Sequence, residues 1–204
     1  MEKVRIWCGG EDALPTVYMH SVAGDGHCVW EACRRIGCPD FNLVSIYDFD
    51  FDGDLTPWPA QGVRKRQPPF KGNAKSHLAE MLDRIMPEAE DLLPAKSLYN
   101  ALAGYSLAGL FALWSVWQTD RFTRLACGSA SFWYPGFLEY AVSHPMVRQP
   151  DFVSLSLGDN ESDTRHPVMS QVGKCTDKVL ELLTERNIPY CFEINPGNHF
   201  TEPD

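Results

Sequence analysis

Along the whole chain, the spacing between apolar residues switches between a strand-like and a helix-like period. Short apolar runs bounded by turn residues predict strands at 4–8, 15–20, 42–47, 98–103, 123–127, 151–157 and 190–194. Apolar residues three or four positions apart predict helices at 27–37, 73–89, 107–117, 137–142 and 167–182. Strands that alternate with helices in this order predict a three-layer α/β fold, in which a mainly parallel sheet carries helices on both faces.

The length and composition indicate one globular domain. The chain has 204 residues, of which 44% are hydrophobic, and it contains no repeat, low-complexity tract or linker, so we expect a single domain over residues 1–204. A net charge of −9 argues against nucleic acid or an anionic membrane as a partner. Seven cysteines without a C-x-x-C pair, and no leader-like apolar run, predict reduced thiols in a cytoplasmic protein. No pattern in the chain indicates a particular oligomeric state.

The boundary between the strand at 98–103 and the following helix carries the clearest chemical signal. The segment Gly104-Tyr105-Ser106-Leu107-Ala108 places a serine at the turn, with a small residue two positions before it and another two positions after it. Such a turn is so tight that both of these positions must be small, as in the G-x-S-x-G nucleophile elbow, from which Ala108 is the one departure. The pattern therefore predicts that Ser106 is a nucleophile at the start of a helix.

A serine nucleophile needs a histidine base, which follows it in the chain in elbow-type folds. Three histidines lie downstream of Ser106: His144, His166 and His199. The first two precede prolines at helix boundaries, where a histidine is typically a surface or capping residue. His199 directly follows the last predicted strand, at the edge of the sheet where Ser106 lies, and we predict that it is the base.

The acid that orients the base is expected at the end of the strand at 151–157. Asp159 and Glu161 both follow this strand. Glu161 has the longer reach and is the first choice. Asp159 is the second choice, with hydrogen bonding to turn amides as its alternative role.

An oxyanion intermediate requires two N–H donors. We expect one from Leu107, directly after the nucleophile, and the other from the loop after His20, with Val22 as first choice and Ser21 as second. Aromatic side chains near the catalytic edge are predicted either to line a substrate pocket or to fill the core: Phe49, Trp58, Tyr105, Trp133 and Tyr134.

Four segments together give the chain a clear family resemblance: Val17-Tyr18-Met19-His20, Gly104-Tyr105-Ser106-Leu107-Ala108-Gly109, Ser156-Leu157-Gly158-Asp159-Asn160-Glu161 and Pro196-Gly197-Asn198-His199-Phe200. The chain resembles the esterase D-like branch of the α/β-hydrolases over about residues 16–200. The resemblance implies that the acid is Glu161, that fewer than eight strands are present because the N-terminal part is shortened, and that there is no separate lid domain. It departs from the family pattern at Ser21, where glycine is more common.

These observations predict a serine hydrolase that cleaves a small-molecule carboxylic ester through an acyl-enzyme, without a metal or cofactor. An acyltransferase with the same acyl-enzyme and a catalytically silent binding protein are the alternatives. The segment 48–54 imitates a calcium loop, D-x-D-x-D-G, but position twelve is Pro59 instead of glutamate, and metal binding is not expected. If these aspartates line the mouth of the pocket, they disfavour strongly anionic esters.

Overall fold

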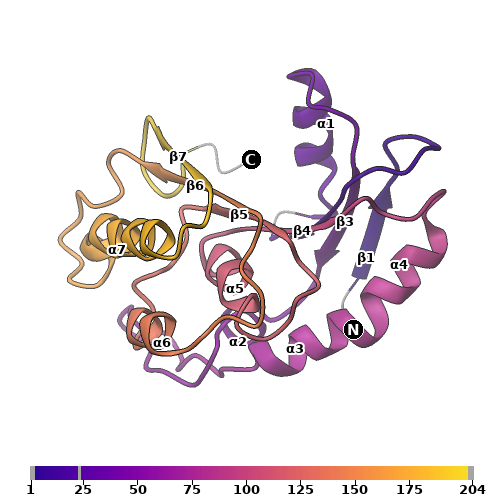
Figure 1. The fold of residues 1–204 in the computed structure, drawn as a ribbon. Helices are drawn as coiled ribbons and strands as arrows, with labels where there is room; N and C mark the ends of the chain where they lie inside the picture. Colours follow the sequence, from indigo (N-terminus) through magenta and orange to yellow (C-terminus); the bar gives the residue numbers. More distant parts are fainter. Residues whose placement is uncertain (1–2, 23, 202–204) are drawn as a thin grey trace.

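The computed structural model describes residues 3–22 and 24–201 and contains one seven-stranded sheet (Figure 1). The strands are β1 (Lys3–Trp7), β2 (Thr16–His20), β3 (Asn42–Tyr47), β4 (Asn100–Tyr105), β5 (Arg124–Gly128), β6 (Phe152–Gly158) and β7 (Tyr190–Asn195). Their order is β1-β3-β2-β4-β5-β6-β7, with β1 antiparallel to β3 and all other neighbours parallel. The predicted mainly parallel α/β sheet with fewer than eight strands is confirmed.

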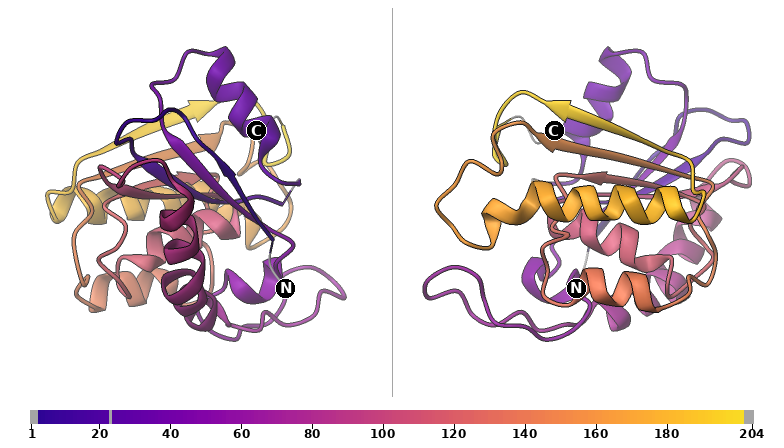
Figure 2. Two further views of the ribbon diagram at one scale, coloured as in Figure 1. Left: turned by 90° about the vertical axis from the view of Figure 1, so that its right-hand side faces the viewer. Right: turned by 60° about the vertical axis from the view of Figure 1, so that its left-hand side comes forward.

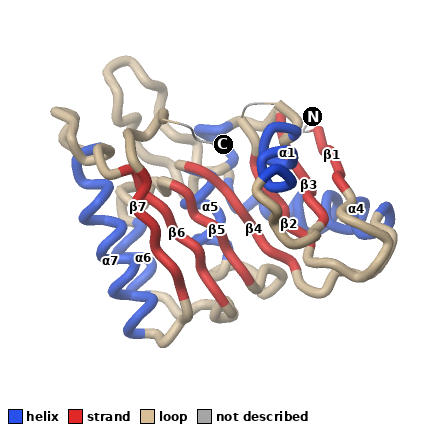
Figure 3. Tube along the Cα trace, turned by 90° about the horizontal axis from the view of Figure 1, so that it is seen from above, coloured by secondary structure: helices blue, strands red, loops and turns tan. Residues whose placement is uncertain are grey.

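Helices cover the two faces of the sheet unequally. The α-helices are α1 (His27–Arg35), α2 (Phe51–Asp54), α3 (Ala74–Glu80), α4 (Met86–Leu92), α5 (Leu107–Ser115), α6 (Phe137–Ser143) and α7 (Val172–Glu185). Only α1 lies on one face, beside β2 and β3, whereas α4, α5, α6 and α7 lie on the other (Figures 1 and 3). The two further views in Figure 2 show the same arrangement, with most helices on one side of the sheet. Helices on both faces are therefore present as predicted, but in the described residues the second face carries one helix only.

Helix α5 forms the centre of the core. All nine of its residues are buried, because the sheet lies on one side of it and other helices and loops enclose the rest. A helix that is apolar on all sides belongs in such a position. None of the helices in the described part of the chain is both long and apolar enough to cross a bilayer.

The helix predicted over 73–89 contains an irregular turn. Helices α3 and α4 are joined by a π-helical turn, Met81–Ile85, and Pro87 lies in the first turn of α4. Proline has no N–H and its ring collides with the carbonyl four residues earlier, so the hydrogen-bond pattern widens before it. The predicted bend at Pro87 corresponds to this π turn.

The aspartates of segment 48–54 stabilise their own loop. The Asp50 side chain accepts a hydrogen bond from the Gly53 N–H at the start of α2, and it also forms an ion pair with Lys71. Asp48 pairs with Lys3, at 2.6 Å. Within residues 3–22 and 24–201, no group of three His, Cys, Asp or Glu side chains is arranged to hold a metal ion.

Candidate active site

The turn between β4 and α5 has the strained geometry of a nucleophile elbow. Ser106 has φ 59° and ψ −118°, a combination that non-glycine residues rarely adopt. A Cβ atom at Gly104 would collide with the backbone of Ala108, so this position accepts only glycine. Hydrogen bonds to neighbouring segments hold the turn: Ser106 donates from its N–H to the Gly128 carbonyl at 2.9 Å, and its own carbonyl accepts from the Ser131 N–H at 3.0 Å.

Three of the predicted side chains meet at the carboxyl edge of the sheet. The Ser106 Oγ lies 3.0 Å from Nε2 of His199, and Nδ1 of His199 lies 2.8 Å from Oε2 of Glu161. The carboxylate accepts a hydrogen bond from the Nδ1–H of the imidazole, which leaves Nε2 as an acceptor for the serine hydroxyl. The three residues follow β4, β6 and β7, so it is the parallel sheet that brings their loops together.

The second oxygen of Glu161 is also fully bonded. Its Oε1 accepts from Ser129 Oγ at 2.5 Å and from the Gly158 N–H at 2.8 Å. The residue is 7% exposed. Burial on its own raises the pKa of Glu161, but the hydrogen bonds from His199, Ser129 and Gly158 outweigh it and hold the pKa below its usual value. The carboxylate is therefore ionised and fixed in orientation beside the imidazole.

Asp159, the second-choice acid, lies at a different point of the same loop. Its Oδ1 accepts from the Gly197 N–H and from the Asn160 side chain, both at 2.8 Å. These bonds tie the loop after β6 to the loop after β7, which carries His199. Asp159 thus bonds to amide groups of these turns, which is the alternative role predicted for it.

The other two downstream histidines lie outside the serine–histidine contact. His144 packs against Tyr140 at the end of α6, with ring centroids 4.2 Å apart. His166 connects two loops: its Nε2 lies 2.7 Å from the Val63 carbonyl oxygen. Both histidines serve local packing or hydrogen bonding, as the residues before a proline at a helix boundary were expected to do.

Three contacts to this group were missed by the sequence reasoning. Ser131 Oγ lies 3.2 Å from the Ser106 Oγ, and Ser129 bonds to Glu161. Tyr105 donates its hydroxyl to the His199 carbonyl oxygen at 2.8 Å. Both serines directly follow a strand, in the segment 128–131, and so lie at the same edge of the sheet as the loops that carry Ser106, Glu161 and His199. This position in the sequence could have indicated them.

Two segments are expected to donate N–H groups to an oxyanion: the start of α5 and the loop after His20. Leu107 begins α5, so its N–H has no acceptor within the helix. The Ser21 N–H is already bonded to the Ile46 carbonyl at 2.9 Å, which removes the second-choice donor. Val22 follows it, and this residue is 65% exposed and lines the cleft. Ser21 therefore does not suit an oxyanion role, and Val22 stays the predicted donor.

A cleft with two lobes opens at the serine–histidine contact. The lobes have volumes of about 470 and 430 Å³, and both are lined by Ser106, His199, Trp133, Met169, Phe200 and Arg64. Together they lie in the size range of small-molecule sites. The wall is mainly apolar, with charged groups at few points.

Of the five aromatic residues predicted for the pocket, Tyr105 and Trp133 line the cleft. The others pack elsewhere. Phe49 lies edge-on against His20, Trp58 donates from its indole N–H to the Pro135 carbonyl at 2.8 Å, and Tyr134 is 2% exposed. These three rings pack in or against the core instead of lining the cleft. Phe49 and Trp58 thereby attach the loop after β3 to the core.

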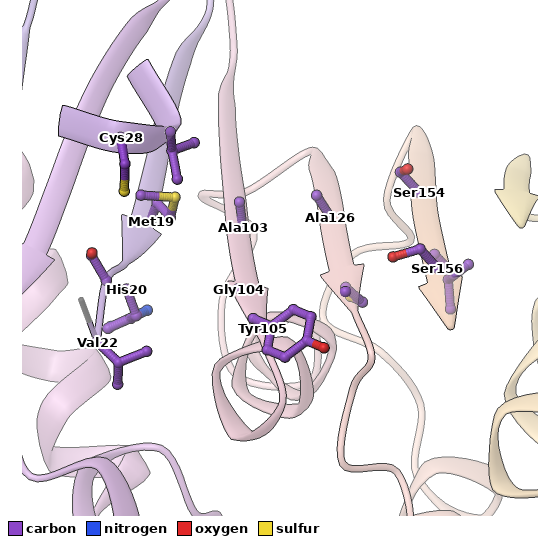
Figure 4. Close-up of a pocket in the computed structure, with 15 residues that line it drawn as sticks. Met19, His20, Val22, Cys28, Ala103, Gly104, Tyr105, Ala126, Ser154 and Ser156 are labelled. Carbon is purple, nitrogen blue, oxygen red and sulfur yellow. The ribbon is translucent and has the colours of Figure 1, made fainter. Parts of the chain in front are cut away.

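A second hollow lies on the face of the sheet that carries α1. It has a volume of about 300 Å³, and small side chains of three neighbouring strands form its floor (Figure 4): Ala103, Ala126, Ser154 and Ser156. Tyr105 and Val22 line both this hollow and the cleft. Ser106 and His199 do not line it.

Comparison with known proteins identifies the fold. No family model matches the chain. Uncharacterized protein YbbA of Bacillus subtilis (strain 168) is 22% identical over 165 residues, which make up 78% of this chain and 66% of that protein. The chain thus spans less than two thirds of the length of this relative.

Solved structures match over nearly the whole chain. An IroE-like serine hydrolase from Shewanella oneidensis superposes with a TM-score of 0.76 at 19% identity, covering 98% of this chain and 71% of that one. Siderophore hydrolase EstA from Aspergillus nidulans gives 0.73 at 17%, covering 97% and 84%, and EstB from the same organism gives 0.68 at 21%, covering 93% and 77%. The chain shares the α/β-hydrolase fold of these hydrolases, and the fold class is therefore as predicted.

Proposed function

We propose that the protein is a serine hydrolase that cleaves small-molecule carboxylic esters. The observation that carries the proposal is the unbroken series of hydrogen bonds from Ser106 through His199 to Glu161, at 3.0 and 2.8 Å, starting from a strained serine at a helix N-terminus. The names of the similar structures, a serine hydrolase and two siderophore hydrolases, support the same reaction class.

In the proposed reaction, Ser106 Oγ attacks the ester carbonyl carbon while His199 Nε2 takes the hydroxyl proton. The carbonyl oxygen becomes an oxyanion, which accepts hydrogen bonds from the N–H groups of Leu107 and Val22. His199 then gives its proton to the leaving alcohol, and the serine remains as an acyl ester. Water, deprotonated by His199, attacks this ester, and the acid leaves as Ser106 regains its proton. Glu161 stabilises the imidazolium in both halves, and no metal or cofactor takes part.

Replacing Ser106 by alanine is the direct test. We expect Ser106→Ala to lower kcat/KM for aryl esters by about 10⁴-fold, because the nucleophile is lost while the fold is kept. Ser143→Ala, at an exposed serine of α6, is the matched control and should keep full activity. Labelling by a fluorophosphonate should occur in the wild type and in Ser143→Ala, and should vanish in Ser106→Ala. Full ester turnover by Ser106→Ala would reject the proposal.

The same measurements separate the alternatives. An acyltransferase would be labelled by the fluorophosphonate, but its acyl-enzyme would accumulate in water and be released only by an added alcohol or thiol. A silent binding protein would bind esters without labelling at Ser106. The proposal requires labelling together with release of the acid in water alone.

We also propose that the protein acts in a reducing compartment, as predicted from its cysteines. All seven are free thiols in the structure. Burial raises the pKa of Cys127 to about 12, so this thiol is unreactive at neutral pH. The test is to extract the protein from cells under acid quench and then to treat it with a maleimide. We expect the other thiols to react, and disulfide-linked cysteines in that extract would reject the proposal.

A further inference from the structure

Arg64 stands where the two lobes of the cleft meet. It lines both lobes, together with Ser106 and His199. Its guanidinium makes no ion pair or hydrogen bond with the rest of the described chain, and the residue is exposed. An arginine with unused donors next to a reactive serine is available to a ligand.

The backbone around Arg64 is fixed by side chains from two segments. Gln67 Oε1 accepts from the N–H groups of Val63 and Arg64, both at 3.1 Å, and so closes a turn. His166 then binds this turn to the loop after β6. Its Nδ1 faces the N–H groups of Val168 and Met169, so its Nε2 carries the proton that is donated to the Val63 carbonyl. Arg64 is therefore held at the cleft by its neighbours.

No carboxylate in the described residues forms an ion pair with Arg64. Asp50 and Asp48, which the sequence placed among possible mouth residues, pair with Lys71 and Lys3 instead. Asp52 lines one lobe, where its Oδ2 lies 3.4 Å from Gln67 Nε2.

In the second lobe, Asp163 lies on the wall together with Arg64. Lys65 and Arg66 follow Arg64 in the chain and are exposed. Asp52 and Asp163 line the lobes, as the expectation that aspartates at the mouth disfavour anionic esters requires, and Arg64 places a positive charge beside them in both lobes.

We propose that Arg64 recognises a carboxylate on the substrate, so that the preferred esters carry a negative charge beside the scissile bond. This proposal rests on the proposed ester hydrolysis and names its substrate class. A planar guanidinium binds a carboxylate through two parallel N–H bonds. A carboxylate bound in this way fixes the ester relative to Ser106 and selects anionic esters over neutral esters of the same shape.

Binding by the Ser106→Ala protein tests the proposal without turnover. Two rigid ester pairs differ only in a carboxylate in place of a methyl group. The pair 4-acetoxybenzoate and 4-methylphenyl acetate carries it on the alcohol side. The pair monomethyl terephthalate and methyl 4-methylbenzoate carries it on the acyl side. The preference is the ratio of the Kd values of the neutral and the anionic member of a pair. In NMR titrations of the Ser106→Ala protein, the additional substitution Arg64→Gln should lower this preference by about tenfold or more for at least one pair.

Lys65→Gln is the matched control, because it removes the same charge from a neighbouring residue that does not line the cleft. It should leave the preference unchanged. An equal loss in both variants would show that only diffuse charge acts, and no loss in Arg64→Gln would show that the arginine is idle; either result overturns the proposal.

Turnover by the wild type distinguishes the two proposals. If the wild type hydrolyses these esters but Arg64→Gln binds them with unchanged preference, ester hydrolysis stands and the role of Arg64 is rejected. The opposite outcome has two parts: Arg64→Gln abolishes the preference in the binding assay, but the wild type neither hydrolyses esters nor reacts with a fluorophosphonate. In that case the carboxylate site stands and the proposed ester hydrolysis is rejected.

Discussion

Ser131 and Ser106 face each other with their hydroxyl oxygens 3.2 Å apart, and Ser131 is fully buried. Since the Ser106 proton points to His199, the hydroxyl of Ser131 donates to Ser106 Oγ. The backbone repeats the contact, because the Ser131 N–H donates to the Ser106 carbonyl at 3.0 Å. Ser131 thus contacts Ser106 through both its hydroxyl and its backbone N–H.

Removing this hydroxyl should slow the reaction moderately. We expect Ser131→Ala to lower kcat/KM for aryl esters by about threefold to tenfold, the equivalent of one hydrogen bond of about 0.5–1.5 kcal/mol. Ser115→Ala is the matched control, since this buried serine of α5 bonds only to the Ala112 carbonyl. Both variants should lose stability in urea unfolding, but only Ser131→Ala should lose rate. Equal rates in the two variants would contradict a positioning role for Ser131.

The bond from Ser129 to Glu161 should be visible as a change in the pKa of the carboxyl group. Ser129→Ala removes one donor to the ionised form, so the pKa of Glu161 should rise towards its ordinary value of 4.5. In the wild type, the lowered pKa contributes stability above about pH 4.5 that is lost as the pH falls through the folded pKa. In the variant this contribution should be smaller, and its loss should be complete at a higher pH. A ¹³C-carboxyl NMR titration measures the shift.

Ser154→Ala, earlier in β6 on the face that carries α1, is the control for this experiment. It should leave the titration of Glu161 as in the wild type. If Ser129→Ala also titrates as the wild type does, Ser129 does not stabilise the carboxylate.

The buried side chain of His20, next to His77, should make the stability of the protein fall at acid pH. His20 and His77 are 4% and 3% exposed, and their Nε2 atoms are 2.7 Å apart. Burial, with a smaller effect from His77, holds the pKa of His20 well below its ordinary value of 6.5. The unfolded chain therefore binds this proton first, and the free energy of unfolding should fall below about pH 6.5, by at most about 1.4 kcal/mol per pH unit for this group.

Replacing His20 by glutamine keeps a hydrogen-bonding group beside His77 but removes the titration. Urea unfolding between pH 5 and 8 should show a smaller loss of stability on the acid side in His20→Gln than in the wild type. Above pH 7 the two pH dependences should run parallel. An unchanged acid slope in the variant would mean that His20 takes up its proton in the folded state.

The sequence by itself determined the order of the elements and predicted the three groups of the proposed triad, with Asp159 left open as a second choice for the acid. Residues near 98–113 switch from a strand period to a helix period at Ser106, and the small Gly104 and Ala108 on either side fit the tight turn of a nucleophile elbow. His199 and Glu161 follow strands whose carboxyl ends must meet at one edge of a parallel sheet. Local spacing and the topology rules of parallel sheets suffice for these conclusions.

Only the tertiary structure decided what surrounds these groups. Ser129 and Ser131 lie in a loop whose sequence fits many turns, and they reach Glu161 and Ser106 because β5 lies beside β4 and β6 in the sheet. Of the predicted pocket aromatics, Tyr134 lies in the core and Phe49 and Trp58 pack against it. The sequence could not show this, because hydrophobic periodicity does not distinguish a core side chain from a pocket wall. Arg64 reaches the cleft from a loop without any periodic signal, through contacts between segments about a hundred residues apart, and such contacts depend on the whole fold.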